Sequence, residues 1–143
     1  MEYLRNEMKM EFLALSANEG FARVAVGAFV AGLNPTVDEL ADLKTAVSEA
    51  VTNCIIHGYE QQEGKIWLSC CIEGRQVEIT VADTGKGIKD IEQAREPLFT
   101  TKPELERSGM GFAFMEAFMD EVEVVSEPRK GTSVMMRKTI GEG

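Results

Sequence analysis

Cysteine and histidine are scarce in this chain, which argues against two common ways of holding a small domain together. Its 143 residues include three cysteines, Cys54, Cys70 and Cys71, and one histidine, His57. The cysteines are odd in number and show no C-x-x-C spacing, so the sequence supports neither a disulfide framework nor a zinc site. We therefore expect the cysteines to be packing residues.

Long apolar runs are also missing. No stretch reaches the about eighteen apolar residues of a membrane-spanning helix. The opening segment, MEYLRNEMKM, lacks the apolar stretch of a signal peptide. We therefore expect a cytoplasmic protein with no membrane partner.

Positively charged residues are fewer than negatively charged ones. The chain has 15 Lys and Arg against 24 Asp and Glu, a formal net charge of -9. A surface of this sign repels the phosphates of DNA and RNA, which argues against direct nucleic-acid binding. Any influence on transcription should therefore pass through a protein partner.

The sequence does contain enough apolar residues, 44%, to build one core, and we expect a single domain over residues 1–143. Period-two patterns predict strands over residues 8–15, 65–72 and 76–83, the last two joined in a hairpin at Glu73-Gly74-Arg75, and a last hairpin that turns at 128–131. Helical patterns predict helices over 16–32, 36–58 and 111–119. S-x-x-E and T-x-x-E capping boxes at Ser16 and Thr36 are expected to begin the first two helices. The elements predict one layered α/β unit.

The second predicted helix carries polar side chains along one edge of its apolar stripe. Glu49, Asn53 and His57 follow one another at intervals of four residues, so they project on the same side. The Asn53 oxygen could ligate Mg²⁺ together with nucleotide phosphates, which leaves Glu49 free to orient or deprotonate an attacking hydroxyl. The alternative is a solvated helix edge. His57 could equally meet the helix dipole or contact a phosphate.

A carboxylate follows the strand predicted over residues 76–83. Period two places Asp83 in the inward row of that strand, and a buried carboxylate needs hydrogen-bond donors. The exocyclic amine of adenine is a suitable donor. Gly85 and Gly87 would let the backbone approach a flat base without a Cβ collision. An ordinary surface Asp-Thr-Gly turn remains the alternative.

A second glycine pair begins the helix predicted over 111–119. The segment Ser108-Gly109-Met110-Gly111 would place backbone N–H groups at a helix N-terminus, where anions are favoured. It has the spacing of neither a P-loop nor a Rossmann fingerprint. The segment therefore indicates a phosphate site in another kind of fold.

These three segments resemble the N box and the two glycine boxes of the Bergerat-fold ATP-binding superfamily, which includes histidine kinases, gyrase, Hsp90 and MutL. The resemblance implies a two-layer α/β sandwich, with a mixed, mostly antiparallel sheet, helices on one face, and ATP beneath a mobile lid over residues 84–108. The run Pro97 to Lys102 resembles the lid motif, and Gly131-Thr132 resembles the closing Gly-Thr element. The implied nucleotide ligands are Asn53, Asp83, Gly85, Gly87, Thr100, Thr101, Lys102, Ser108, Gly109, Met110, Gly111 and Thr132, with Glu49 catalytic and Asn53 on Mg²⁺.

The runs over residues 48–59 and 97–111 are very similar to the anti-sigma F factor family of endospore-forming bacteria. The resemblance implies a homodimer that keeps sigma F from RNA polymerase and uses ATP to phosphorylate a serine of an anti-anti-sigma factor. We expect the phosphoacceptor on another protein, because the chain has no room for the dimerisation helix of a sensor kinase. Two other functions stay open: an ATP-gated sequestering module of the general stress-response type, and an ATPase motor.

The first predicted helix offers a docking surface. Glu19 and Arg23 lie four residues apart and are expected to be exposed on an otherwise small and apolar segment. They form either a simple surface ion pair, worth about 0 to 1 kcal/mol, or a patch that binds the sigma factor or anti-anti-sigma protein, with Arg23 as the anchor.

Overall fold

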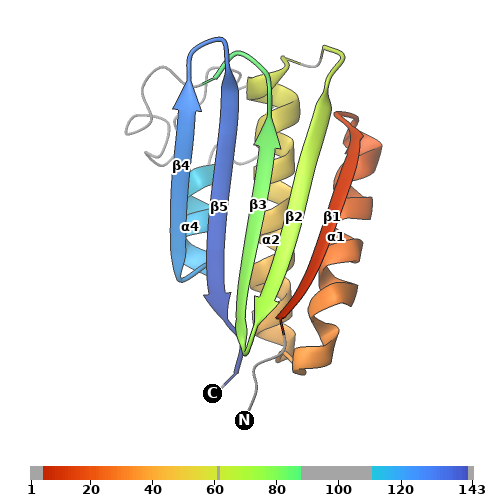
Figure 1. The fold of residues 1–143 in the computed structure, drawn as a ribbon, viewed down its shortest axis with the longest axis vertical. Coiled ribbons are helices and arrows are strands. Elements are labelled where there is room, and N and C mark those ends of the chain that lie inside the picture. The colour runs from red at the N-terminus through yellow and green to blue at the C-terminus, as the bar shows by residue number, and fades with distance from the viewer. Residues whose placement is uncertain (1–4, 61, 88–110, 142–143) are drawn as a thin grey trace.

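The computed structural model describes residues 5–60, 62–87 and 111–141, which form a sheet with helices on one face (Figure 1). The strands are β1 (Arg5–Leu13), β2 (Lys65–Glu73), β3 (Gln76–Asp83), β4 (Glu121–Glu127) and β5 (Gly131–Thr139). The helices are α1 (Ser16–Val30), α2 (Val37–Asn53) and α4 (Gly111–Phe118). A short 3-10 turn, η1 (Ala31–Leu33), follows α1, and a π-helical turn, η2 (Cys54–Gly58), continues α2.

The sheet has the strand order β1-β2-β3-β5-β4. All pairings among the described strands are antiparallel, so the expected mostly antiparallel sheet is confirmed and no parallel pair is found there. Both predicted hairpins form. Gly74, with a φ of 63°, occupies the tight β2–β3 turn, and the β4–β5 hairpin turns over residues 128–130.

The helices cover only one face of the sheet, with α1 behind β1, α2 behind the centre and α4 behind β4 and β5 (Figure 1). Every second residue of β3, from Val77 through Ile79 and Val81 to Asp83, is buried beneath them. The predicted stripe of α2 supplies the facing layer, with Leu43, Val47, Ala50 and Val51 fully buried and Cys54 nearly so. The predicted two-layer α/β sandwich is therefore confirmed.

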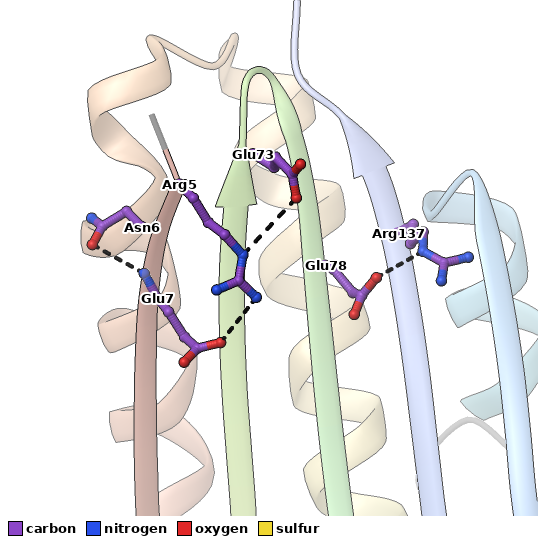
Figure 2. Close-up of polar contacts among 6 residues, drawn as sticks. All are labelled: Arg5, Asn6, Glu7, Glu73, Glu78 and Arg137. Carbon is purple, nitrogen blue, oxygen red and sulfur yellow. Dashed lines mark hydrogen bonds and ion pairs between the residues drawn. The ribbon is translucent and has the colours of Figure 1, made fainter. Parts of the chain in front are cut away.

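The opposite face of the sheet is mostly polar, although Trp67 on β2 and Val125 on β4 are exposed there. Arg5 on β1 lies 3.4 Å from Glu7 and 4.0 Å from Glu73, and Arg137 on β5 lies 2.8 Å from Glu78. Figure 2 shows these side chains paired on the open face of the sheet. Exposed pairs of this kind contribute little to stability. The apolar residues of the strands thus concentrate on the face that the helices cover.

The two predicted capping boxes have different outcomes. At α2 the Thr36 hydroxyl accepts the Glu39 N–H at 3.0 Å, and the Glu39 carboxylate accepts the Thr36 N–H at 2.9 Å, as predicted. At α1 the prediction is wrong, because the N-cap is Leu15 and it makes no side-chain cap bond. The Glu19 carboxylate pairs with Arg23 instead of folding back onto the helix start.

The helices in the described part of the chain are too short or too polar to cross a lipid bilayer.

Candidate functional site

The candidate site lies at the end of the sheet where β3 finishes. In Figure 1 the tip of β3, the β4–β5 hairpin and the C-terminal end of α2 meet at this edge, at the top of the view. Asp83 is the last residue of β3 and pairs with Ile66 on one side and Thr132 on the other. Its side chain is only 5% exposed, so the alternative of a surface turn is wrong.

The two carboxylate oxygens of Asp83 have different environments. Oδ1 accepts the Gly85 N–H at 2.8 Å, whereas Oδ2 is buried and has no hydrogen-bond partner among the described residues. Burial raises the pKa of the Asp83 carboxyl, although the Gly85 N–H, the Cys54 thiol and the Thr132 N–H lower it in part. An unpaired buried acceptor costs about 1–3 kcal/mol, more if it is charged, and this cost is recovered when a ligand donates a hydrogen bond.

The π-helical turn brings the end of α2 against this carboxylate. The Tyr59 N–H donates to the Cys54 carbonyl at 2.9 Å, an i to i+5 bond that widens the last turn. Burial raises the pKa of the Cys54 thiol well above its usual value, and the neighbouring Asp83 raises it further. The thiol therefore stays neutral, in keeping with the expected packing role. Single π turns inside helices are frequently found at functional sites.

Two glycines permit the close approach of α2 to the segment after β3. A Cβ on Gly58 would lie 2.9 Å from the Asp83 Cγ, and a Cβ on Gly85 would lie 2.1 Å from the Gly58 carbonyl oxygen. The Lys86 N–H donates to that same oxygen at 2.9 Å. Gly87 follows in a turn with a φ of 77°. The predicted first glycine box is thus packed directly on η2, the turn that continues the helix of the predicted N box.

Thr132 borders the carboxylate from β5. It is 5% exposed, and its hydroxyl lies 2.8 Å from the Ser126 hydroxyl on β4. The strand register places Thr132 directly opposite Asp83. Its contact with a nucleotide stays a prediction.

Glu49 and Asn53 lie on the last turns of α2, and both are partly buried. Asn53 directly precedes Cys54, which neighbours the Asp83 carboxylate, so α2 leads the amide to the same edge of the sheet. No group of three or more His, Cys, Asp or Glu residues that could hold a metal is found in residues 5–60, 62–87 and 111–141. An Mg²⁺ ion at Asn53 would therefore need phosphate oxygens and water as its other ligands. His57 is partly buried within η2, and its role stays open.

Several predicted residues lie outside the part that the structure describes. They are Thr100, Thr101, Lys102, Ser108, Gly109 and Met110, together with most of the expected lid over 84–108. Gly111 begins α4, as expected for the residue that ends the second glycine box.

Sequence reasoning missed four residues that shape the site: Cys54, Gly58, Tyr59 and Thr84. The Cys54 thiol and Gly58 lie against the Asp83 carboxylate. The Tyr59 hydroxyl accepts the N–H of Thr84, the residue that follows Asp83. Only the glycine carried a usable signal, since a glycine at the end of a long helix often marks a close approach or a cap. The other three contacts depend on tertiary packing.

The predicted docking pair is less exposed than expected. The Arg23 guanidinium lies 3.2 Å from the Glu19 carboxylate, and the two side chains are 42% and 19% exposed. Arg23 also donates to the Ser48 hydroxyl at 3.3 Å, so it ties α1 to α2 directly beside Glu49.

Comparison with known proteins agrees with this architecture. The family described as "Histidine kinase-like ATPase domain" matches residues 12–138. The chain is 61% identical over 136 residues to the anti-sigma F factor of Anoxybacillus flavithermus, covering 94% of this chain and 93% of the relative. It is 57% identical over 140 residues to the anti-sigma F factor of Bacillus subtilis, covering 97% and 96%.

A solved structure supports the fold alone. The crystal structure of the RsbU and RsbW domains of a Mycobacterium tuberculosis protein superposes with a TM-score of 0.69 at 18% identity, covering 96% of this chain and 33% of that one. Taken with the matches to curated relatives over nearly their full length, the chain belongs to the anti-sigma F factor family and carries its histidine kinase-like ATPase domain.

Proposed function

We propose that this protein is an ATP-dependent serine kinase that also acts as an anti-sigma factor. In this proposal it holds sigma F away from RNA polymerase and phosphorylates a serine of an anti-anti-sigma partner, in the cytoplasm. Its membership in the family supports an ATP-dependent kinase domain. The observation that carries the nucleotide site is the buried, unpaired Oδ2 of Asp83.

Asp83 would recognise the base. Its Oδ2 accepts a hydrogen bond from the exocyclic amine of adenine, while Oδ1 stays on the Gly85 N–H. A hydrogen bond to a charged group contributes about 1.5–3 kcal/mol, and it would also recover the cost of burying Oδ2 in the empty site. Gly85 would contribute indirectly, because its missing side chain lets the segment after Asp83 pack against the Gly58 carbonyl.

The end of α2 and the start of α4 would hold the phosphates. The Asn53 oxygen would ligate Mg²⁺, which neutralises phosphate charge when bound. Backbone N–H groups of residues 108–111 and the side chains of Thr100, Thr101 and Lys102 would bind the phosphates. Gly87 and Thr132 would complete the ligand set.

Glu49 would act on the acceptor. It is placed one helical turn before Asn53 and is partly buried, so it can face a hydroxyl at the phosphate end of the site. The carboxylate takes the proton of the serine hydroxyl as the serine oxygen bonds the γ-phosphorus, and the bond to the bridging oxygen breaks to release ADP.

The decisive experiment mixes γ-labelled ATP, Mg²⁺ and the purified anti-anti-sigma protein with wild type, Glu49→Gln and Glu73→Gln. Glu73 lies on the open face, is 68% exposed and serves as the matched carboxamide control. Glu49→Gln should keep ATP affinity within about twofold and lose at least a hundredfold in transfer rate, as for removal of a general base. Equal loss of binding and transfer would refute the assigned role of Glu49.

The same assay separates the alternatives. The Asp83 acceptor would bind a nucleotide whether or not phosphate is transferred. The second candidate function is therefore an ATP-gated sequestering module of the stress-response type. It predicts no labelled acceptor and sigma binding that still depends on ATP. Phosphate release without an acceptor would instead indicate an ATPase motor.

The docking proposal concerns α1. Glu19 and Arg23 would bind the sigma factor or the anti-anti-sigma protein, next to two exposed apolar side chains, Phe21 and Val24. Arg23→Ala should weaken partner binding at least tenfold without changing ATP affinity, whereas Arg5→Ala on the open face should do neither. We also propose a homodimer, which sedimentation should detect as twice the monomer mass.

A further inference from the structure

Tyr59 joins three segments that meet at the candidate site. It follows η2, and its hydroxyl donates to the Lys65 carbonyl at the start of β2, at 2.5 Å. The same oxygen accepts the Thr84 N–H at 2.9 Å and lies 3.2 Å from the Thr84 hydroxyl. Thr84 is the residue between Asp83 and Gly85.

The hydrogen-bonding capacity of this phenol is completely used. A phenol has one proton and two acceptor positions, and the proton goes to the Lys65 carbonyl, which can only accept. The Thr84 hydroxyl must then be the donor in its contact with Tyr59. The ring cannot easily shift, because it lies so close to Gly64 that a Cβ there would come within 2.5 Å of a ring carbon.

The contacts of Tyr59 influence the Asp83 carboxylate through two successive peptide groups. Tyr59 fixes the N–H of Thr84, and the next N–H along the chain, that of Gly85, donates to Asp83 Oδ1 at 2.8 Å. With Oδ1 occupied, Oδ2 is left as the acceptor without a partner.

We propose that Tyr59 is a positioning residue for base recognition: it orients the Thr84–Gly85 peptide so that Asp83 presents Oδ2 to the 6-amino group of a purine nucleotide. The inference rests on the proposed contact between Asp83 and adenine. A purely structural role, in which Tyr59 only joins β2 to η2, is the competing explanation.

The test measures dissociation constants by calorimetry for ATP and for purine riboside triphosphate, which has hydrogen in place of the 6-amine. Both are titrated into wild type, Tyr59→Phe and Thr84→Val. Tyr59→Phe should weaken ATP roughly threefold to tenfold, the range for one hydrogen bond, and change the analogue less than twofold. Thr84→Val keeps the N–H that Tyr59 accepts, so its preference for ATP should match that of wild type.

Each other outcome overturns a defined step. Equal weakening of both nucleotides by Tyr59→Phe, or no weakening, overturns the positioning role. A loss of preference in Thr84→Val as large as in Tyr59→Phe overturns the route through the Thr84 N–H. If wild type itself does not prefer ATP to the analogue, the proposed base contact of Asp83 is wrong, and the Tyr59 inference falls with it.

A second measurement needs no variant, in case Tyr59→Phe does not fold. Amide hydrogen exchange on the nucleotide-free wild type should show the Thr84 and Gly85 amides protected at least tenfold over their intrinsic rates, because both donate to side chains. Exchange of either amide at the intrinsic rate would overturn the proposal.

Discussion

Replacing Asp83 by Asn should strengthen the nucleotide-free fold while weakening nucleotide binding. Asn has nearly the same shape, and its carbonyl oxygen can keep the Gly85 N–H bond that Oδ1 makes at 2.8 Å. Its amide nitrogen then takes the position of Oδ2. A donor replaces the acceptor there, and it would face the donor amine of adenine.

The stability change follows from the direction of the pKa shift. Burial raises the pKa of Asp83 above that of the unfolded chain, so between the two pKa values the folded protein keeps a proton that the unfolded chain has lost. The free energy of unfolding therefore falls as pH rises through that interval and stays lowered above it. Each pKa unit of difference corresponds to about 1.4 kcal/mol. The carboxamide of Asp83→Asn cannot ionise, so at pH 7 the variant should be the more stable protein.

ATP binding by Asp83→Asn should be weaker than that of wild type, although the variant is more stable. Loss of a hydrogen bond to a charged acceptor, about 1.5–3 kcal/mol, corresponds to a rise of roughly 10- to 150-fold in the dissociation constant for ATP. Urea unfolding at pH 7 and near pH 3.5 measures the first effect, and calorimetry measures the second. The stability difference should shrink at the lower pH, where the carboxyl is mostly protonated in both states. Glu73→Gln, which removes an exposed charge, is the control for net charge.

An unchanged ATP affinity in Asp83→Asn would refute the assignment of Oδ2 to the base. A loss of stability at pH 7 would refute the claim that burial of the carboxylate is costly in the empty site. Parallel losses of stability and affinity would mean that Asp83 is needed mainly for the fold.

Two other substitutions test the local geometry. Gly58→Ala would place a Cβ 2.9 Å from the Asp83 Cγ and should weaken ATP binding about tenfold or more by calorimetry, whereas Gly32→Ala, with no atom within 4 Å, should not. Thr36→Ala should lower the free energy of unfolding in urea by about 1 kcal/mol through loss of the cap, and Ser16→Ala should have almost no effect; equal losses would contradict the assigned caps.

Much of the fold follows from local patterns. The alternation from Val77 to Asp83 predicted which side of β3 is buried, and the Glu73-Gly74-Arg75 turn predicted the β2–β3 hairpin. The capping motifs show the limit of such reasoning. The motifs at Ser16 and Thr36 have the same spacing, yet only the second forms a capping box. At the first, the Glu19 carboxylate has a competing partner in Arg23.

Sequence motifs selected the candidate site residues but did not predict their geometry. The inward direction of Asp83 followed from period two, but its single unpaired oxygen depends on where the Gly85 N–H points. That direction depends in turn on Tyr59, which is 24 residues from Asp83 in sequence and reaches its neighbour Thr84 through the packing of η2 against β3. Sequence periodicity carries no information on such a contact.

The costly features of the described structure meet at one edge of the sheet. A π turn interrupts the regular bonding of the long helix, and beside it a carboxylate is buried with one oxygen unpaired. Local conflicts of this kind are expected where a site is kept ready for a ligand. A nucleotide that supplies the missing donor stabilises only the folded state, by about 2.7 kcal/mol at a hundred times its dissociation constant. Nucleotide supply and the folding of this edge are therefore thermodynamically linked, and partner binding that depends on the same edge would be linked to them as well.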